Sequence, residues 1–114
     1  MIEKLIEVVN VKTVGGKNAN GIKYIGRTGK LGLGNPIVLK RGMTKGSTLP
    51  DYKKYLWQLW QDDQDGVVWS NIKAIADEVK AGKEVKLACH CSPFACHGDV
   101  IKSAILWLIR EEVV

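Results

Sequence analysis

The residues best able to do chemistry lie together between Cys89 and His97. All three cysteines and both histidines of the 114-residue chain fall in this segment. The apolar residues before it indicate a strand, and side chains alternate between the faces of a strand, so Cys89 and Cys91 would point one way and His90 the other. A proline then ends the strand, and Cys96 and His97 would lie where a helix begins. The segment therefore predicts a site at a strand-to-helix connection.

Two chemistries fit this segment. The set Cys89, Cys91, Cys96 and His97 offers three sulfurs and one imidazole, a ligand set of tetrahedral zinc, although its spacing is tighter than that of the usual zinc knuckles. Alternatively, Cys96 is a nucleophilic thiolate, because a helix N-terminus and a nearby imidazole both favour the deprotonated sulfur. His97 and Asp99 would then complete a catalytic group, with Asp99 orienting the imidazole or binding a ligand hydroxyl. Burial of Cys89 as a small core residue is a third interpretation.

The second candidate site is the glycine-rich stretch from residue 26 to residue 36. Gly26 and Gly34 would let a ligand approach the backbone closely, and the guanidinium of Arg27 suits a phosphate group. Asn35 could bind a base or ribose edge. The stretch contains neither a Walker motif nor the dinucleotide fingerprint, so it supports neither ATP hydrolysis nor NAD binding. The alternative is a structural turn in which Arg27 forms a salt bridge.

Positive charge is concentrated in the first half of the chain. Residues 1–54 contain eleven Lys and Arg against three acidic residues, a net charge of +8, whereas residues 55–114 have a net charge of −3. This asymmetry favours an anionic partner: a nucleotide, a nucleic-acid backbone or an acidic protein. We expect a cytoplasmic protein with no membrane segment, because no apolar run reaches the length of a span, no signal-peptide pattern is present, and an odd number of clustered cysteines suits a reducing compartment.

The first half of the chain reads as strands and loops. Residues 5–14 and 22–25 are rich in β-branched types, and an Asn-Gly turn signal precedes the second of them. This pattern predicts a β-hairpin in which 22–25 is the returning strand.

The second half predicts helix, helix, strand and helix. Apolar residues recur at helical spacing over 49–62 and 67–81, and Gly82 suits a left-handed helix stop. A short apolar run over 84–91 indicates a buried strand, and an amphipathic pattern follows from residue 98 onwards.

These elements predict one small α/β sandwich over residues 1–114, with at least one crossover. Ligands of such folds bind beyond the carboxyl ends of the strands, where helix N-termini meet them, and the Cys/His segment falls at such a place. The four tryptophans fall in predicted helices, where core or interface positions are more common than base stacking, so we leave them out of the site.

Three motifs, in this order, resemble domain-of-unknown-function family 4326. They are Tyr24-Ile25-Gly26-Arg27, Leu33-Gly34-Asn35-Pro36 and the C-x-C-x-P-x-x-C-H-G-D run from Cys89 to Asp99. The resemblance extends over nearly the whole chain and departs at position 90, where members often carry tryptophan. It implies a Rossmann-like α/β fold and an origin in phages or bacteria, and it brings no established reaction. The positions that match the family's signature are Gly26, Arg27, Gly34, Asn35, Pro36, Cys89, Cys91, Pro93, Cys96, His97, Gly98 and Asp99.

We therefore expect a small enzyme or enzyme-like domain that binds a nucleotide or a nucleic-acid component. Arg27 and the glycine loops would hold phosphate, while the Cys/His segment would supply zinc or a thiolate for transferase or hydrolase chemistry. The rival hypothesis is a non-catalytic, zinc-stabilised module whose basic half docks on nucleic acid or on an acidic host protein, in the host cytoplasm if a phage encodes the chain. A third hypothesis is an interaction protein whose cysteines are merely buried. The sequence leaves the substrate, the metal and the oligomeric state open.

Overall fold

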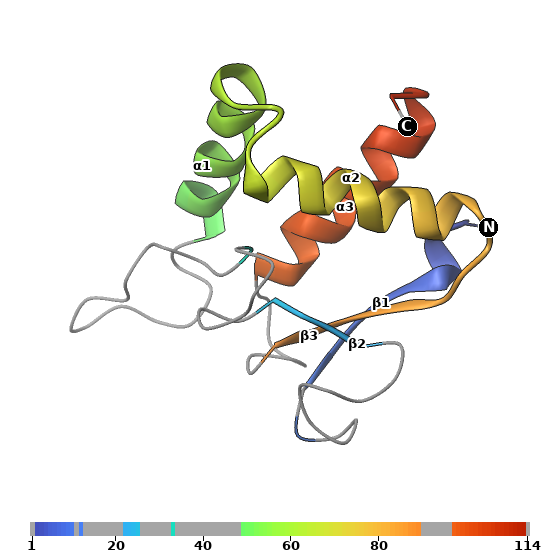
Figure 1. The fold of residues 1–114 in the computed structure, drawn as a ribbon. Coiled ribbons are helices and arrows are strands. Elements are labelled where there is room, and N and C mark those ends of the chain that lie inside the picture. Colours follow the sequence, from blue (N-terminus) through green and yellow to red (C-terminus); the bar gives the residue numbers. More distant parts are fainter. Residues whose placement is uncertain are drawn as a thin grey trace.

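The computed structural model describes residues 2–10, 12, 22–25, 33, 49–89 and 97–113. Along these residues the chain forms a short 3-10 helix, η1 (Ile2–Leu5), followed by strands and helices in two layers (Figure 1). The strands are β1 (Ile6–Asn10), β2 (Ile22–Tyr24) and β3 (Val85–Cys89), and the helices are α1 (Leu49–Asp62), α2 (Val67–Lys80) and α3 (His97–Arg110). The expected α/β class and the order helix, helix, strand, helix are confirmed.

The described strands form a parallel sheet in which β3 lies between β1 and β2. Asn10 of β1 pairs with Cys89, and Tyr24 of β2 pairs with Ala88, so the carboxyl ends of the strands meet at one edge. β3 takes the central place because it is the most apolar strand: every residue except Lys86 is buried. Parallel strands covered on both faces typically have such near-continuous apolar sequences.

The predicted hairpin is wrong. Strand β2 does not return against β1, because β3 lies between the two and pairs with each of them in parallel. An Asn-Gly signal reports only a local preference for a tight turn, whereas strand order is decided by which segment buries most apolar surface. Here the edge positions go to β1 and β2, which carry the charged residues Glu7 and Lys23.

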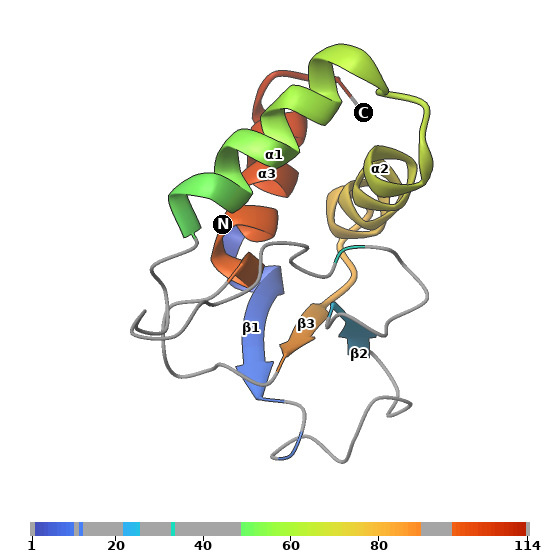
Figure 2. The same cartoon turned by 90° about the vertical axis from the view of Figure 1, so that its left-hand side faces the viewer.

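The described helices lie on the same face of the sheet (Figure 2). Each presents a stripe of apolar residues to the strands and to its neighbours, as the helical spacing predicted. The fully or almost fully buried side chains on these stripes are Tyr52, Leu56, Trp69, Ile72, Ile75, Ala76, Val79, Ile101, Ala104, Ile105 and Leu108. The other face of the sheet carries a smaller cluster of Val9 and Ala88 with Ile22 and Tyr24 packed against them.

Local signals fix the helix boundaries. α1 has the predicted bounds, and α2 ends one residue before the predicted end. Gly82 follows α2 with a φ of +93°, its N–H donates to the carbonyl of Val79, and the N–H of Lys83 donates to that of Glu78. This pair of bonds is the Schellman stop that the glycine indicated. No helix in the described part of the chain is long and apolar enough to cross a membrane.

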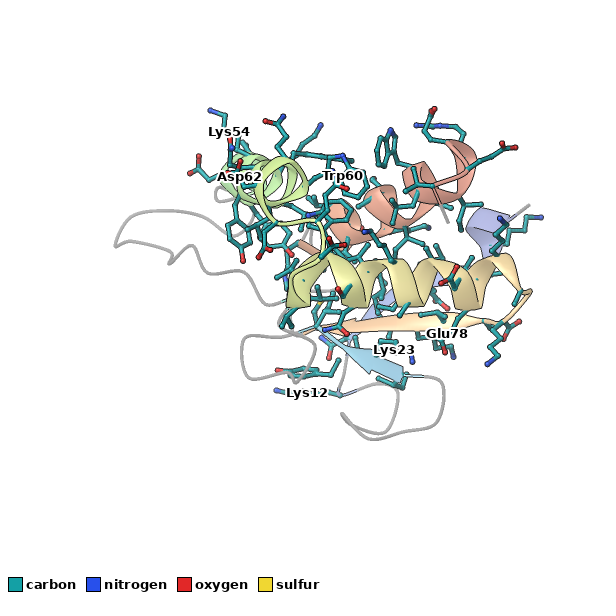
Figure 3. The ribbon with its side chains drawn as sticks, turned by 45° about the horizontal axis from the view of Figure 1, so that its top comes forward. Lys12, Lys23, Lys54, Trp60, Asp62 and Glu78 are labelled. Carbon is teal, nitrogen blue, oxygen red and sulfur yellow. The ribbon has the colours of Figure 1, made fainter. Side chains whose placement is uncertain are left out.

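The edge strand β2 is also held to a helix by charge. Lys23 Nζ lies 3.1 Å from Glu78 Oε2 of α2, and both side chains are about one-third exposed (Figure 3). This ion pair joins the edge of the sheet to the helical layer.

The four tryptophans form one cluster between the helices. Trp57, Trp60, Trp69 and Trp107 have ring centroids 4.8–5.5 Å apart, mostly in tilted or edge-to-face pairs. Trp69 is fully buried, and its indole N–H donates to the carbonyl of Leu56 over 2.9 Å. Packing between helices is therefore one role of these residues, as expected.

Candidate functional site

The carboxyl edge of the sheet is where the predicted chemical residues begin to converge. The register places Asn10 of β1 beside Cys89 of β3, with Tyr24 of β2 one position earlier on the opposite side. The side-chain Oδ1 of Asn10 accepts a hydrogen bond from the N–H of Lys12 over 2.9 Å, which turns the chain directly after β1. Loops that leave such an edge are the usual ligand sites of α/β sheets.

His97 is the first residue of α3 and is only 7 % exposed. Its Nε2 lies 2.6 Å from the carbonyl oxygen of Ile25. A carbonyl can only accept, so Nε2 carries the hydrogen and donates it. In the neutral ring, Nδ1 then holds the lone pair that can accept a proton or bind a metal. The hydrogen bond thereby leaves Nδ1, rather than Nε2, as the nitrogen with a lone pair, which the sequence does not show.

Ile25 lies at the end of β2 and is completely buried. Its N–H donates to the carbonyl of Ala88 in β3 over 2.9 Å, while its own carbonyl accepts from His97. Ile25 is the residue directly before Gly26 and Arg27. The residue that precedes the glycine-rich stretch is therefore hydrogen-bonded to the first residue of α3, although 72 residues separate the two.

Leu33, within the glycine-rich stretch, is held by α1. Leu33 is almost completely buried, and its carbonyl accepts a hydrogen bond from the hydroxyl of Tyr52 over 3.0 Å. The Tyr52 ring in turn packs edge-on against the His97 imidazole, with centroids 5.3 Å apart and an interplanar angle of 70°. Ile25 is therefore tied to α3 and Leu33 to α1, and the two anchoring side chains, His97 and Tyr52, contact each other.

Tyr52 is the functional candidate that the sequence analysis missed, since it treated this residue only as part of an apolar stripe. A signal was available. Tyr52 is completely buried, and a buried phenol needs a hydrogen-bond acceptor, so a tyrosine in the middle of an amphipathic stripe indicates a polar contact at that depth.

Cys89 is the last residue of β3, whose predicted range of 84–91 continues beyond the described residues, and its side chain belongs to the core between the sheet and the helices. It is 1 % exposed. Burial of this thiol agrees with a packing role and equally with a ligand in a site closed to water. The structure therefore keeps both interpretations of Cys89 open.

Asp99 lies two residues after His97, and two helical residues subtend about 200°. Its side chain is exposed and lines a groove between α1 and α3 together with Trp57 and Trp107, whereas the His97 ring is buried against Tyr52. The two side chains thus have different surroundings, and the role of Asp99 in orienting His97 stays a prediction. A carboxylate in the first turn also stabilises the helix N-terminus.

The remaining predicted site residues lie outside the described residues. These are Cys91, Cys96, Gly26, Arg27, Gly34 and Asn35. Among residues 2–10, 12, 22–25, 33, 49–89 and 97–113, no group of three or more Cys, His, Asp or Glu side chains is close enough to hold a metal ion. The predicted zinc set has two of its four members outside these ranges, so it stays a prediction.

Comparison with known proteins assigns the chain to a family. The family model described as "Domain of unknown function (DUF4326)" matches residues 9–107. No curated protein and no solved structure matches the chain. The match covers most of the chain, including every predicted site residue, and the chain belongs to this family.

Proposed function

We propose that this member of domain-of-unknown-function family 4326 binds a phosphorylated ligand, a nucleotide or a nucleic-acid segment, at the carboxyl edge of its sheet. The observation that carries the proposal is the hydrogen bond from His97 Nε2 to the carbonyl of Ile25. It joins the two motifs that the sequence singled out, because Ile25 directly precedes the glycine-rich stretch and His97 ends the Cys/His segment.

The phosphate would be held by Arg27 and by the backbone of the loop. Two residues of chain reach at most about 7 Å, so the residue two positions after Ile25 starts close to this edge. An arginine side chain is long enough to reach from there to the beginning of α3, where the positive end of the helix dipole attracts anions. The net charge of +8 on residues 1–54 raises the local concentration of such ligands.

The Cys/His segment would supply the chemistry beside this phosphate. A histidine that binds a metal usually donates its other ring N–H to a carbonyl or carboxylate, which orients the ring. His97 has this arrangement, since Nε2 donates to Ile25 and Nδ1 remains for zinc or for a proton. Cys96 precedes His97 directly, and Cys89 is buried at the end of β3. These groups would form either a zinc site or a thiolate with a neighbouring base, serving transferase or hydrolase chemistry.

The phosphate part of the proposal is tested by calorimetric titration of the whole chain. The probes are inorganic phosphate, nucleoside mono-, di- and triphosphates, and a single-stranded oligonucleotide. We expect at least one nucleotide or the oligonucleotide to bind, with an affinity that falls as salt increases. Arg27→Ala should weaken binding about tenfold or more, whereas Lys54→Ala, an exposed charge on α1, should not. Absence of binding to every probe would refute the proposal.

The metal part is tested by the zinc content of the purified protein and by alkylation with iodoacetamide. Zinc bound at one equivalent, together with loss of folding on chelation, supports the non-catalytic, zinc-stabilised module. Zinc that can be removed without unfolding supports a catalytic metal site. A metal-free chain with one fast-alkylating cysteine, located at Cys96 by mass spectrometry, supports the thiolate. If neither zinc nor a reactive thiol is found, both roles of the Cys/His segment are wrong.

A further inference from the structure

A groove runs along the surface between α1 and α3. Its volume is about 340 Å³. The side chains that line it include two half-buried indoles and four charged or polar groups: Trp57 and Trp107, with Lys53, Asp99, Ser103 and Arg110. Apolar surface of this kind, rimmed by polar groups, is typical of an interaction site.

The α3 side of the groove has opposite charges at its two ends. Asp99 lies in the first turn of the helix and Arg110 in the last. Eleven residues along a helix span about 16 Å. They also turn the helix by three full turns and only about 20° more, so both side chains lie on the same face. Between them on this face lie a small residue, Ser103, and a large one, Trp107.

Such a stripe is complementary to itself when the helix is reversed. In an antiparallel pair of α3 helices related by a twofold axis near residue 105, Asp99 of each copy faces Arg110 of the other. The same operation brings Trp107 of each copy to within one residue, about 1.5 Å along the axis, of the level of Ser103 of the other, so a bulky side chain meets a small one. Closed homodimers need this property, since the same surface patch must fit itself.

We propose that the occupant of the groove is a second copy of this chain, with α3 packed antiparallel on α3 of the partner and α1 flanking it. An acidic peptide would place its charges against Asp99, and a parallel pair of α3 helices would place Asp99 on Asp99. The antiparallel pair alone matches both ends of the stripe. The Arg110 guanidinium is 71 % accessible and lies 3.5 Å from Glu111, in an exposed ion pair that a partner's carboxylate can replace. Indoles and arginines are the side chains that most often dominate the binding energy of interfaces.

Sedimentation velocity over a range of concentrations of the whole chain tests this proposal. The wild type should dimerise, and each single charge reversal, Asp99→Arg or Arg110→Asp, should raise the dimer dissociation constant about tenfold or more, because like charges then face each other. The double swap, Asp99→Arg with Arg110→Asp, should restore the dimer. The matched control is Asp77→Arg, which reverses an exposed acid on α2 and should leave the dimer unchanged.

Two outcomes overturn the proposal: a wild type that stays monomeric throughout, or a dimer that tolerates both single reversals. Thermal denaturation followed by circular dichroism identifies any variant that fails to fold. Ser103→Arg then serves as a further variant, because it introduces a bulky charge at an exposed position opposite Trp107 of the second copy. It should prevent dimerisation while leaving the melting of the monomer close to that of the other folded variants.

Discussion

The hydroxyl of Tyr52 gives the most direct test of how the glycine-rich loop is anchored. In Tyr52→Phe the ring and its packing against His97 remain, but the donor to the carbonyl of Leu33 is lost. Both residues are almost completely buried, so water cannot easily replace the hydroxyl. A buried acceptor left without its partner costs about 1–3 kcal/mol of the free energy of unfolding.

This cost predicts a measurable change in melting temperature. With an unfolding entropy of about 2.1 cal/mol/K per residue, a chain of 114 residues loses about 4 °C for each kcal/mol. We therefore expect the melting temperature of Tyr52→Phe to fall by about 4–12 °C in differential scanning calorimetry, and urea unfolding to give the same loss of free energy with an unchanged m-value.

The matched control is Tyr55→Phe, on the same helix. Tyr55 is half-buried and its ring lies 5.8 Å from that of Tyr52, so the substitution removes a phenol hydroxyl in nearly the same surroundings. It should cost less than about 0.5 kcal/mol, as surface substitutions usually do. If both variants lose the same free energy, the hydrogen bond from Tyr52 does not hold the end of the loop. If Tyr52→Phe also binds nucleotide more weakly than Tyr55→Phe does, the hydrogen bond from Tyr52 serves the proposed ligand site as well as the fold.

Three further substitutions test other contacts. His97→Ala should lower the free energy of unfolding in urea by about 2–4 kcal/mol, because it leaves a void and an unpaired carbonyl at Ile25. His97→Gln keeps a donor and should lower it clearly less. Equal losses in the two variants would contradict the hydrogen bond. Gly82→Ala should lower the free energy of unfolding, measured by calorimetry, by about 1–2 kcal/mol. The loss would come from backbone strain alone, since an added Cβ would meet no neighbouring atom at this φ of +93°. An unchanged stability would contradict the left-handed stop. A double-mutant cycle with Lys23→Ala and Glu78→Ala should give a coupling free energy of about 0.2–1 kcal/mol between the two side chains, and this energy should fall as salt is added. A coupling free energy of zero at low salt would show that this ion pair does not hold β2.

The sequence predicts well those features that depend on neighbouring residues. The bounds of α1 follow from apolar residues at helical spacing, and the end of α2 follows from Gly82, because both signals act within a few residues. The central strand was also identified, since a short apolar run between turns is typical of a buried strand in a small α/β fold.

Strand order was not predictable in the same way. A hairpin between β1 and β2 satisfies every local signal, and only the arrival of β3 from 60 residues further along the chain excludes it. Pairing of this kind is decided by burial of the whole sheet, which no short window of sequence contains. The same holds for Tyr52 and His97, whose acceptors lie 19 and 72 residues away. Residue type identified His97 as a candidate, and Tyr52 was found only when its partner was known.

The hydrogen bond of His97 also changes the relation between the two chemistries proposed for the Cys/His segment. With Nε2 donating to Ile25, the neutral imidazole has one lone pair left, on Nδ1. A zinc ion would bind that lone pair, and a thiolate at Cys96 would need the same atom as its base. Zinc binding and base catalysis by His97 therefore exclude each other in any one molecule. A chain that holds zinc through His97 cannot use this ring as the base for a cysteine, and a Cys96 that is deprotonated by this ring must leave Nδ1 without a metal. The sequence presents the two chemistries as alternatives because the residue types suit both, whereas the structure makes them alternatives because they share one atom.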